Sequence, residues 1–252
     1  YTAVIDGYSS EGLGIARVNG RLQALAAEKY TVASDCTWPP MEMLNAQKQP
    51  EGYSTDYIRA VAKAAGFEVD VRNIAWDGIF GGVATGKYDI VASSTTITPE
   101  RQKQFDFSDP YYEVVQAVVL PAGTSIRSLA DLKGKKVGGQ IGTTGIFVMR
   151  KADVGADLKE YDDVGLAIQD MVGGRLDAVI CDDPVAMYYV NKKADYAGKL
   201  NLSFKTGDKE YYGFTVRKGR QDLVDKLNKG IKQVKESGLE AKLIEKWMGK
   251  SN

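Results

Sequence analysis

The chain has 252 residues, of which 44% are hydrophobic and 26% charged, as in ordinary soluble globular proteins. Lys plus Arg and Asp plus Glu both number 33, and this zero net charge gives no electrostatic reason to expect nucleic-acid or membrane-surface binding. Histidine, the commonest general base and zinc ligand, is absent from the sequence, which argues against most hydrolases and metalloenzymes.

Cysteine content and hydropathy add two further points. Cys36 and Cys181 are too few for a metal site, and they could form one disulfide or remain two buried thiols. No run of residues reaches the ~20 apolar residues of a membrane span. The sequence starts at Tyr1 with neither an initiator Met nor a signal peptide, so we expect a processed chain whose export signal has been removed.

From Tyr30 onward, short β-rich runs alternate with helical patterns, which predicts α/β layering with mainly parallel strands. Strands are expected at 30–34, 67–71, 88–92, 114–120, 136–139, 178–181 and 211–216. Helices are expected at 54–65, 79–85, 128–132, 143–152 and 163–172, followed by two amphipathic helices that Gly238 separates.

Two segments of the chain resemble each other in residue type, Gly86-Lys-Tyr-Asp-Ile-Val-Ala-Ser93 and Gly174-Arg-Leu-Asp-Ala-Val-Ile-Cys181. Each has a helix-ending Gly, a basic residue, an Asp and then a buried strand. Any turn from a helix to a strand can have this pattern. The pair also predicts two similar lobes, each with the carboxyl end of a strand at a shared cleft, where open α/β sheets bind ligands.

Thr96-Ile-Thr-Pro-Glu-Arg101, followed by Asp106-Phe-Ser-Asp-Pro-Tyr-Tyr112, resembles the signature of the polar amino-acid-binding family of ABC-transporter solute-binding proteins. The resemblance extends in register over residues 30–249. It includes Trp-Pro-Pro-Met-Glu at 38–42, Gly52-Tyr-Ser-Thr-Asp56, Trp76-Asp-Gly78, Gly142-Thr-Thr144, 177–184 and Lys246-Trp-Met-Gly249. So many matches in order make the resemblance specific.

This resemblance implies a two-lobed periplasmic-binding-protein-like α/β fold of type II. Each lobe would be a mainly parallel sheet flanked by helices, and two crossing strands would join the lobes as a hinge. The expected parts are lobe 1 at 30–110 plus 216–252, lobe 2 at 116–210, and the hinge at 111–115 and 211–215. Closure about the hinge would place groups of both lobes on one ligand.

The charged ends of a free amino acid require specific partners. A carboxylate favours a guanidinium and backbone N–H donors, and the resemblance assigns this role to Arg101, Thr144 and Thr96. Thr144 follows Gly142-Thr143 at the start of an expected helix, whose N-terminal amides favour anions. The ammonium would bind Asp182, Ser94 and Thr96. Without the resemblance, Arg101 would be a surface arginine and Asp182 a helix cap; with it, Asp183 is the expected cap.

The resemblance also assigns six residues to the ligand side chain: Asp35, Trp38, Trp76, Ser93, Gln140 and Cys181. Two tryptophan faces suit a long aliphatic stem, an amide or a guanidinium, although most tryptophans simply pack in a core. Asp35 would face a polar or basic group, or would form a turn. Cys181 departs from the polar residue that is frequent in the family. Arginine or lysine and glutamine are all compatible ligands.

The expected function is the substrate-binding component of an amino-acid ABC transporter, without catalysis, cofactor or metal. The expected partners are a free amino acid and the ABC permease in the membrane, with no nucleic acid, and the protein is expected to be a periplasmic or extracellular monomer, with a lipid anchor as one option. One alternative is the sensor domain of a receptor, which would need a membrane anchor. Another is a dehydratase-like enzyme on the same fold, which would need an acid/base carboxylate in the cleft.

Residues 1–29 form an extra N-terminal segment that the family does not explain. The alternation and turns in 1–6 and 10–20 predict a β-hairpin, and residues 1–20 resemble the start of the TRAM domain of RNA uracil methyltransferases. The segment could be a fusion remnant, an artificial addition or a chance resemblance, and its expected structural consequence is an added hairpin or arm.

Overall fold

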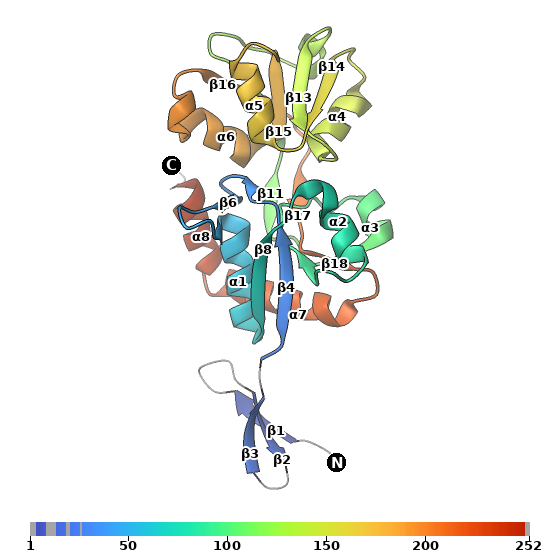
Figure 1. Cartoon of the computed structure of the whole chain (residues 1–252), viewed down its shortest axis with the longest axis vertical. Coiled ribbons are helices and arrows are strands. Elements are labelled where there is room, and N and C mark those ends of the chain that lie inside the picture. Colours follow the sequence, from blue (N-terminus) through green and yellow to red (C-terminus); the bar gives the residue numbers. More distant parts are fainter. Residues whose placement is uncertain (1–3, 9–13, 19–20, 26, 250–252) are drawn as a thin grey trace.

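The computed structural model describes residues 4–8, 14–18, 21–25 and 27–249, the first three ranges as backbone only. Two five-stranded sheets, each flanked by helices, form two lobes that lie one above the other, joined by a narrow ribbon (Figure 1). A separate three-stranded sheet at the N-terminus lies beyond the first lobe (Figure 1).

The first lobe is built on a sheet with strand order β10-β18-β9-β4-β8. Its strands are β4 (Lys29–Ser34), β8 (Glu68–Asn73), β9 (Ile90–Val91), β10 (Phe105–Phe107) and β18 (Thr215–Arg217). Side chains alternate between the two faces, so Val32 and Ile90 pack with one group of helices while Ala33 and Val91 pack with α2. The lobe's helices are α1 (Tyr53–Ala65), α2 (Trp76–Ala84), α3 (Pro99–Gln104), α7 (Gln221–Glu236) and α8 (Leu239–Met248).

The second lobe repeats this plan with strand order β14-β13-β15-β12-β16. Its strands are β12 (Gln116–Pro121), β13 (Lys136–Gln140), β14 (Asp157–Tyr161), β15 (Ala178–Asp182) and β16 (Leu200–Lys205). Its helices are α4 (Thr144–Ala152), α5 (Val164–Val172) and α6 (Asp183–Asn191), with short 3-10 helices at Leu129–Leu132 and Ala194–Tyr196. Ile180 faces the α4 side of the sheet, whereas Val179 and Cys181 face the side of α5 and α6.

Both sheets are mixed, which corrects the expectation of mainly parallel sheets. In each sheet, two of the four strand pairings are parallel and join three strands, and the other two pairings are antiparallel. The antiparallel strands β18 and β12 enter their sheets directly from the other lobe, so they run against the strands that the local helices connect. The α/β class and the two lobes are as predicted.

The resemblance between segments 86–93 and 174–181 corresponds to the same structural unit in each lobe. Gly86 and Gly174 have φ angles of 77° and 76°, a left-handed conformation that glycine adopts without steric cost. The Asp three residues later accepts a backbone N–H from the start of the neighbouring strand: Asp89 from Thr31 at 2.8 Å and Asp177 from Lys136 at 2.7 Å. The repeated residues therefore fix the starts of β9 and β15.

The chain crosses between the lobes twice, along β11 (Tyr112–Val114) and β17 (Glu210–Tyr212), which pair antiparallel. The expected single strand at 211–216 is therefore wrong, because β17 belongs to the crossing and β18 to the first lobe. Next to the ribbon, the ring of Tyr111 stacks on Phe214 with 4.4 Å between centroids and an 11° interplanar angle. Both residues are buried, so aromatic packing attaches the ribbon to the first lobe.

The helices of the first lobe pack closely where a glycine permits it. A Cβ on Gly230 of α7 would lie 2.5 Å from the carbonyl oxygen of Val61 in α1. The observed bounds of the helices differ by one or a few residues from the expected ones. α1 begins at Tyr53, one residue before the expected start, with Gly52 as its N-cap, and α2 begins at Trp76, earlier than expected.

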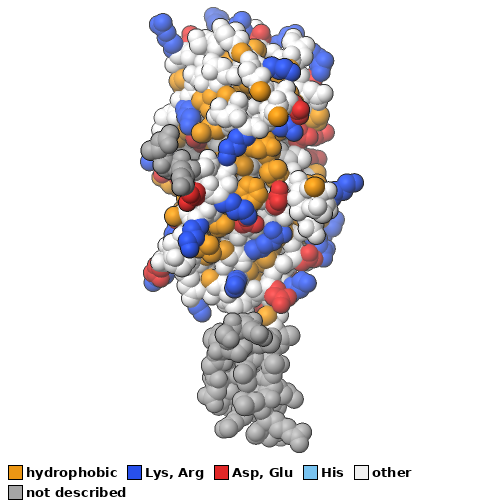
Figure 2. Space-filling view, turned by 90° about the vertical axis from the view of Figure 1, so that its left-hand side faces the viewer, with side chains coloured by type: hydrophobic (Ala, Val, Ile, Leu, Met, Phe, Trp, Pro, Cys, Tyr) orange, Lys and Arg blue, Asp and Glu red, His pale blue; other side chains and the backbone are white. Residues whose placement is uncertain are grey.

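The small elements include β5 (Thr37–Trp38), β6 (Glu42–Leu44) and β7 (Pro50–Glu51), which form a sheet beside α1. None of the helices in the described part of the chain is both long and apolar enough to cross a membrane. On the side that carries α6 and α8, Lys, Arg, Asp and Glu side chains are intermingled (Figure 2). This distribution agrees with the zero net charge of the sequence.

The N-terminal sheet has strand order β1-β2-β3, with β1 (Val4–Tyr8), β2 (Gly14–Val18) and β3 (Arg21–Leu25) all antiparallel. The segment thus contains two consecutive hairpins, one more than expected. The resemblance to a TRAM domain falls partly on residues outside the described ranges, and it stays a prediction.

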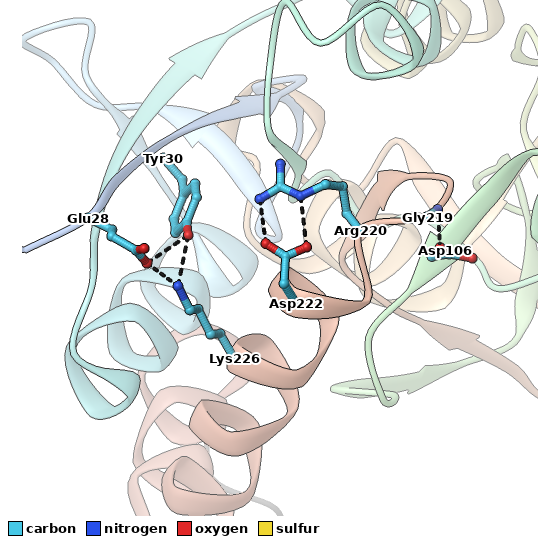
Figure 3. Close-up of polar contacts among 7 residues, drawn as sticks. All are labelled: Glu28, Tyr30, Asp106, Gly219, Arg220, Asp222 and Lys226. Carbon is cyan, nitrogen blue, oxygen red and sulfur yellow. Dashed lines mark hydrogen bonds and ion pairs between the residues drawn. The ribbon is translucent and has the colours of Figure 1, made fainter. Parts of the chain in front are cut away.

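Polar contacts surround the junction between this segment and the first lobe (Figure 3). Lys226 of α7 forms an ion pair with Glu28 and donates to the Tyr30 hydroxyl at 3.1 Å, and Tyr30 donates to Glu28 at 2.9 Å. The hydrogen bond from Lys226 lowers the pKa of Glu28 below its usual range. Nearby, Arg220 and Asp222 form a bidentate pair. Exposed pairs of this kind contribute little stability.

Candidate functional site

A small cavity lies between the two lobes, where the carboxyl ends of β4 and β9 face those of β13 and β15. Its volume is about 20 Å³, enough for about one water molecule. The lining residues are Asp35, Trp38, Trp76, Ser93, Ser94, Thr96, Arg101, Gln140, Thr143, Thr144 and Asp182. Ten of the eleven predicted site residues thus lie together at the cavity, and Cys181 does not.

Backbone carbonyl groups of both lobes hold the Arg101 side chain at the cavity. Thr98 caps α3 by accepting the Arg101 N–H, and the guanidinium donates to Thr96 O at 2.9 Å and Gly142 O at 3.1 Å. Burial lowers the pKa of Arg101 to about 10, opposed by Asp182 and Glu210, so the side chain remains charged at neutral pH. Three of its five N–H groups remain available for other acceptors, sufficient for a bidentate bond to a carboxylate.

The N-terminus of α4 supplies a second group of donors. Thr143 is the N-cap, and its hydroxyl donates to Gln140 O at 2.7 Å instead of capping the helix. The first N–H groups of a helix have no intrahelical partners, and the helix dipole favours an anion there. Because Thr143 and Thr144 both line the cavity, this end of α4 faces it.

Asp182 ends β15 and is the buried acidic group of the second lobe. Its carboxylate accepts from Trp38 Nε1 at 3.3 Å, Gln116 Nε2 at 2.5 Å and the Tyr212 hydroxyl. Burial, with a smaller contribution from the charge of Glu210, raises the pKa of Asp182 to about 7, although the three hydrogen bonds oppose this shift. Asp183, the expected helix cap, instead accepts the Val115 N–H and pairs with Lys205.

Two serines follow β9, and their hydroxyls make contacts within the protein. Ser93 Oγ accepts the N–H of Asp35 at 2.9 Å. Ser94 has a left-handed φ of 42°, and its hydroxyl donates to the fully buried Glu42 at 2.7 Å. Burial raises the pKa of Glu42 well above its usual range. Ser94 can therefore offer a ligand its backbone more readily than its hydroxyl.

Gln140 and Asp35, which both line the cavity, form a bond between the lobes. Gln140 donates to Asp35 Oδ2 at 2.9 Å and to Asp162 O at 2.8 Å, while Thr37 donates to Asp35 Oδ1. Burial raises the pKa of Asp35. Trp76 lies at the cavity with the Arg101 guanidinium 5.5 Å from its ring centroid. The cavity lining therefore also includes the acidic Asp35 and two tryptophans, Trp38 and Trp76.

Cys181 lies elsewhere because of strand alternation. It shares the face of β15 with Val179 and packs in the core toward α5 and α6. Both cysteines are free, buried thiols, which excludes the disulfide that the sequence left open. Burial raises the pKa of Cys36 to about 12 and that of Cys181 well above its usual range.

Four residues at or near the site escaped prediction, Gln116, Thr143, Glu210 and Tyr212. Gln116 is a buried amide inside the otherwise apolar strand β12, and that exception was the available signal. Glu210 and Tyr212 lie in a crossing strand, whose proximity to the cavity only the tertiary structure reveals. Within the described ranges, no cluster of three or more acidic or cysteine side chains has the arrangement of a metal site.

Comparisons with known proteins give a consistent result. The family model described as bacterial extracellular solute-binding proteins, family 3, matches residues 30–250. A probable histidine-binding protein of Neisseria gonorrhoeae is 36% identical over 225 residues, which are 88% of this chain and 83% of that protein.

Solved structures agree with the sequence comparisons. An ancestral arginine-binding protein bound to arginine superposes with a TM-score of 0.83 at 38% identity, over 89% of this chain and 100% of the other. An ancestral arginine-binding protein bound to glutamine gives the same TM-score and identity, over 90% of this chain and 100% of the other. The chain therefore belongs to the bacterial extracellular solute-binding proteins of family 3.

Proposed function

We propose that this protein binds one free amino acid in the cavity between its lobes and has no catalytic role. The main support is that one cavity brings together a cation of the first lobe and an anion of the second. Arg101 of the first lobe keeps donors available for a carboxylate, beside the N-terminus of α4. Asp182 of the second lobe offers an anion for an ammonium. A zwitterion satisfies both groups at once.

We infer that the ligand side chain is polar or basic, and we favour a basic one. Arg101 is the only cation among the described residues that line the cavity, whereas Asp35 and Asp182 are both acidic. Once Arg101 and Asp182 bind the main-chain groups, Asp35 remains for a side-chain cation. The relatives named for histidine and arginine support this inference, and the neighbour bound to glutamine keeps that ligand as an alternative.

We propose that ligand entry requires the lobes to separate about β11 and β17. The cavity of about 20 Å³ has room for about one water molecule, and the bonds Trp38–Asp182, Gln140–Asp35 and Arg101–Gly142 join the lobes across it. The proposed lobes remain 30–110 plus 216–252 and 116–210. Binding then stabilises the closed form by its differential affinity for the two conformations.

In this proposal a membrane ABC permease is the partner that receives the ligand from the closed form. The protein acts as a monomer in the periplasm or outside the cell, where the family's description places its members. A lipid anchor and binding to nucleic acid are not needed for this role. Delivery to a permease also explains why the site would bind an amino acid by its charged ends without reacting with it.

A thermal-shift screen of the twenty L-amino acids, followed by calorimetry on the positive ones, tests the proposal. A ligand that binds only the native state raises its stability, by about 2.7 kcal/mol at a concentration 100 times Kd. We expect the largest shift with arginine or lysine. The matched controls are agmatine, which lacks the carboxylate, and D-arginine. Failure of all twenty amino acids to raise the melting temperature would refute amino-acid binding.

A further inference from the structure

The crossing strand β17 places one carboxylate between the two lobes. Glu210 Oε2 accepts the hydroxyl of Thr144, in the second lobe, at 2.6 Å, and the hydroxyl of Thr96, in the first lobe, at 3.0 Å. Its other oxygen, Oε1, accepts Gln116 Nε2 at 3.2 Å. Glu210 is thus bonded to both lobes from the strand that connects them, directly behind two residues that line the cavity.

These bonds determine what the two threonine hydroxyls can offer a ligand. A hydroxyl has one proton to donate and two lone pairs that accept. Both protons are directed at Glu210, and Thr144 Oγ1 also accepts Gln116 Nε2 at 3.1 Å. The Thr96 hydroxyl can therefore only accept a hydrogen bond from a ligand. That is the requirement of an ammonium and the opposite of what a carboxylate needs.

The amide of Gln116 links Glu210 to the other acidic group of the site. Its Nε2 lies 2.5 Å from Asp182 Oδ1 and 3.2 Å from Glu210 Oε1, and the side chain is buried. Two carboxylates and an acceptor-only hydroxyl therefore lie on the same side of the site. Arg101 and the backbone amides of α4 then provide donors for the carboxylate on the other side.

We propose that Glu210 is a specificity-determining positioning residue, which makes the site select ligands with a free α-ammonium group by fixing the Thr96 hydroxyl as an acceptor. The proposal rests on amino-acid binding as the function of the site. Glu210 itself acts from behind Thr96 and Thr144, so it acts on the ligand through them. Replacing its carboxylate by an amide supplies an N–H donor and releases the orientation of the hydroxyl.

The test is a double-mutant cycle with L-arginine as the probe, measured by calorimetry in wild type, Glu210→Gln, Thr96→Val and the double variant. We expect Glu210→Gln to weaken binding at least about tenfold, or about 1.4 kcal/mol. If Glu210 acts through Thr96, the double variant loses no more than about twofold beyond the larger single loss. Fully additive losses, or unchanged affinity in Glu210→Gln, would overturn the proposal.

A second ligand distinguishes an effect of Glu210 on recognition of the ligand ammonium from simple stabilisation of the hinge. For 5-guanidinopentanoic acid, which is arginine without its amino group, we expect Glu210→Gln to bind no more weakly than wild type. An equal loss of affinity for this acid and for arginine would show that Glu210 stabilises the hinge and has no role toward the ammonium. The matched control is Glu113→Gln, a carboxylate on the partner strand β11 that pairs with Lys209 at the surface, and it should bind arginine normally.

Two further outcomes are possible, and each of them still tests the proposal. If Glu210→Gln does not fold, Thr96→Ser and Thr96→Val in the wild-type background replace it. The proposal requires that serine retains binding and that valine loses it about tenfold. If wild type binds no amino acid at all, the proposed function fails, and that result is distinct from a cycle in which wild type binds and the losses add.

Discussion

The two lobes share one scaffold and differ in the charge that they bring to the cavity. In both, three strands pair in parallel, and a fourth strand enters antiparallel from the other lobe. In both, a left-handed Gly and an Asp fix the start of the strand that ends at the cavity, β9 or β15. After β9 comes the segment that contains Arg101, whereas β15 ends in Asp182.

This difference shows how a repeated fold forms a site for an asymmetric ligand. Asp182 lies at the end of β15, where the repeated segments place Ser94 in the first lobe, and the cation Arg101 comes from α3 a few residues further on. The cation for the carboxylate comes from the first lobe and the anion Asp182 for the ammonium from the second, so affinity depends on their joint contact. The predictions below test this division of roles between the lobes.

The largest effect is expected from removing the first lobe's cation. Arg101→Ala should weaken amino-acid binding more than about 100-fold, because two charge-assisted bonds to a carboxylate are lost. Calorimetry gives the affinity, and circular dichroism checks that the fold is retained. The matched control is Arg72→Ala, which removes an arginine paired with Asp70 at the surface of the same lobe. Unchanged affinity in Arg101→Ala would show that the site is elsewhere.

The second lobe's anion should make binding depend on pH. A ligand ammonium favours ionised Asp182, whose pKa in the free protein is about 7, so affinity should fall about tenfold per unit below pH 7. Calorimetry in two buffers of different ionisation enthalpy should detect release of a proton at pH 6. Asp182→Asn should bind weakly and without this pH dependence. A flat profile in wild type would contradict the assigned role.

The same shift affects stability with a defined sign. Because the pKa of Asp182 is raised in the folded state, its protonated form stabilises the free protein. This contribution is complete below the unfolded value of ~3.9 and is lost as pH rises through about 7. Asp182→Asn should therefore reduce the decline in melting temperature of the free protein between pH 5 and pH 8.

A smaller effect should come from packing within the first lobe alone. Gly230→Ala should reduce the free energy of unfolding by about 1–3 kcal/mol, since its Cβ would meet Val61 backbone. Gly81→Ala in α2 has nothing within 4 Å of its Cβ and should stabilise by about 0.5–1 kcal/mol. Urea unfolding measures both. Stabilisation by Gly230→Ala would show that α1 and α7 can move apart without cost.

The smallest effect is expected at the surface of the first lobe, far from the charges that the lobes share. Lys226→Ala removes the contacts to Glu28 and Tyr30 that Figure 3 shows. Because the Glu28 and Lys226 side chains are 61% and 37% exposed, the loss should be below about 1 kcal/mol and should shrink at high salt. Amino-acid affinity should not change. A loss of several kcal/mol in urea unfolding would contradict this ranking.

The sequence by itself determined the class of fold, the family and most of the cavity lining. The reason is local: Gly86 and Gly174 end helices where only a left-handed turn fits, and alternating apolar runs predict buried strands. Residues at strand ends, such as Ser94 and Asp182, could then be placed at a shared edge. The family resemblance added Arg101, whose role no local pattern indicates.

Only the tertiary structure decided which way each side chain faces and what lies behind the lining. Cys181 was expected at the ligand, but the register of β15 turns it to the α5 and α6 side. Glu210 and Gln116 come from strands far apart in the chain, and their contacts with Thr144 form only when the crossing strand and the second lobe are assembled. Sequence patterns report local conformation and burial, whereas hydrogen bonds between distant residues depend on the packing of whole lobes.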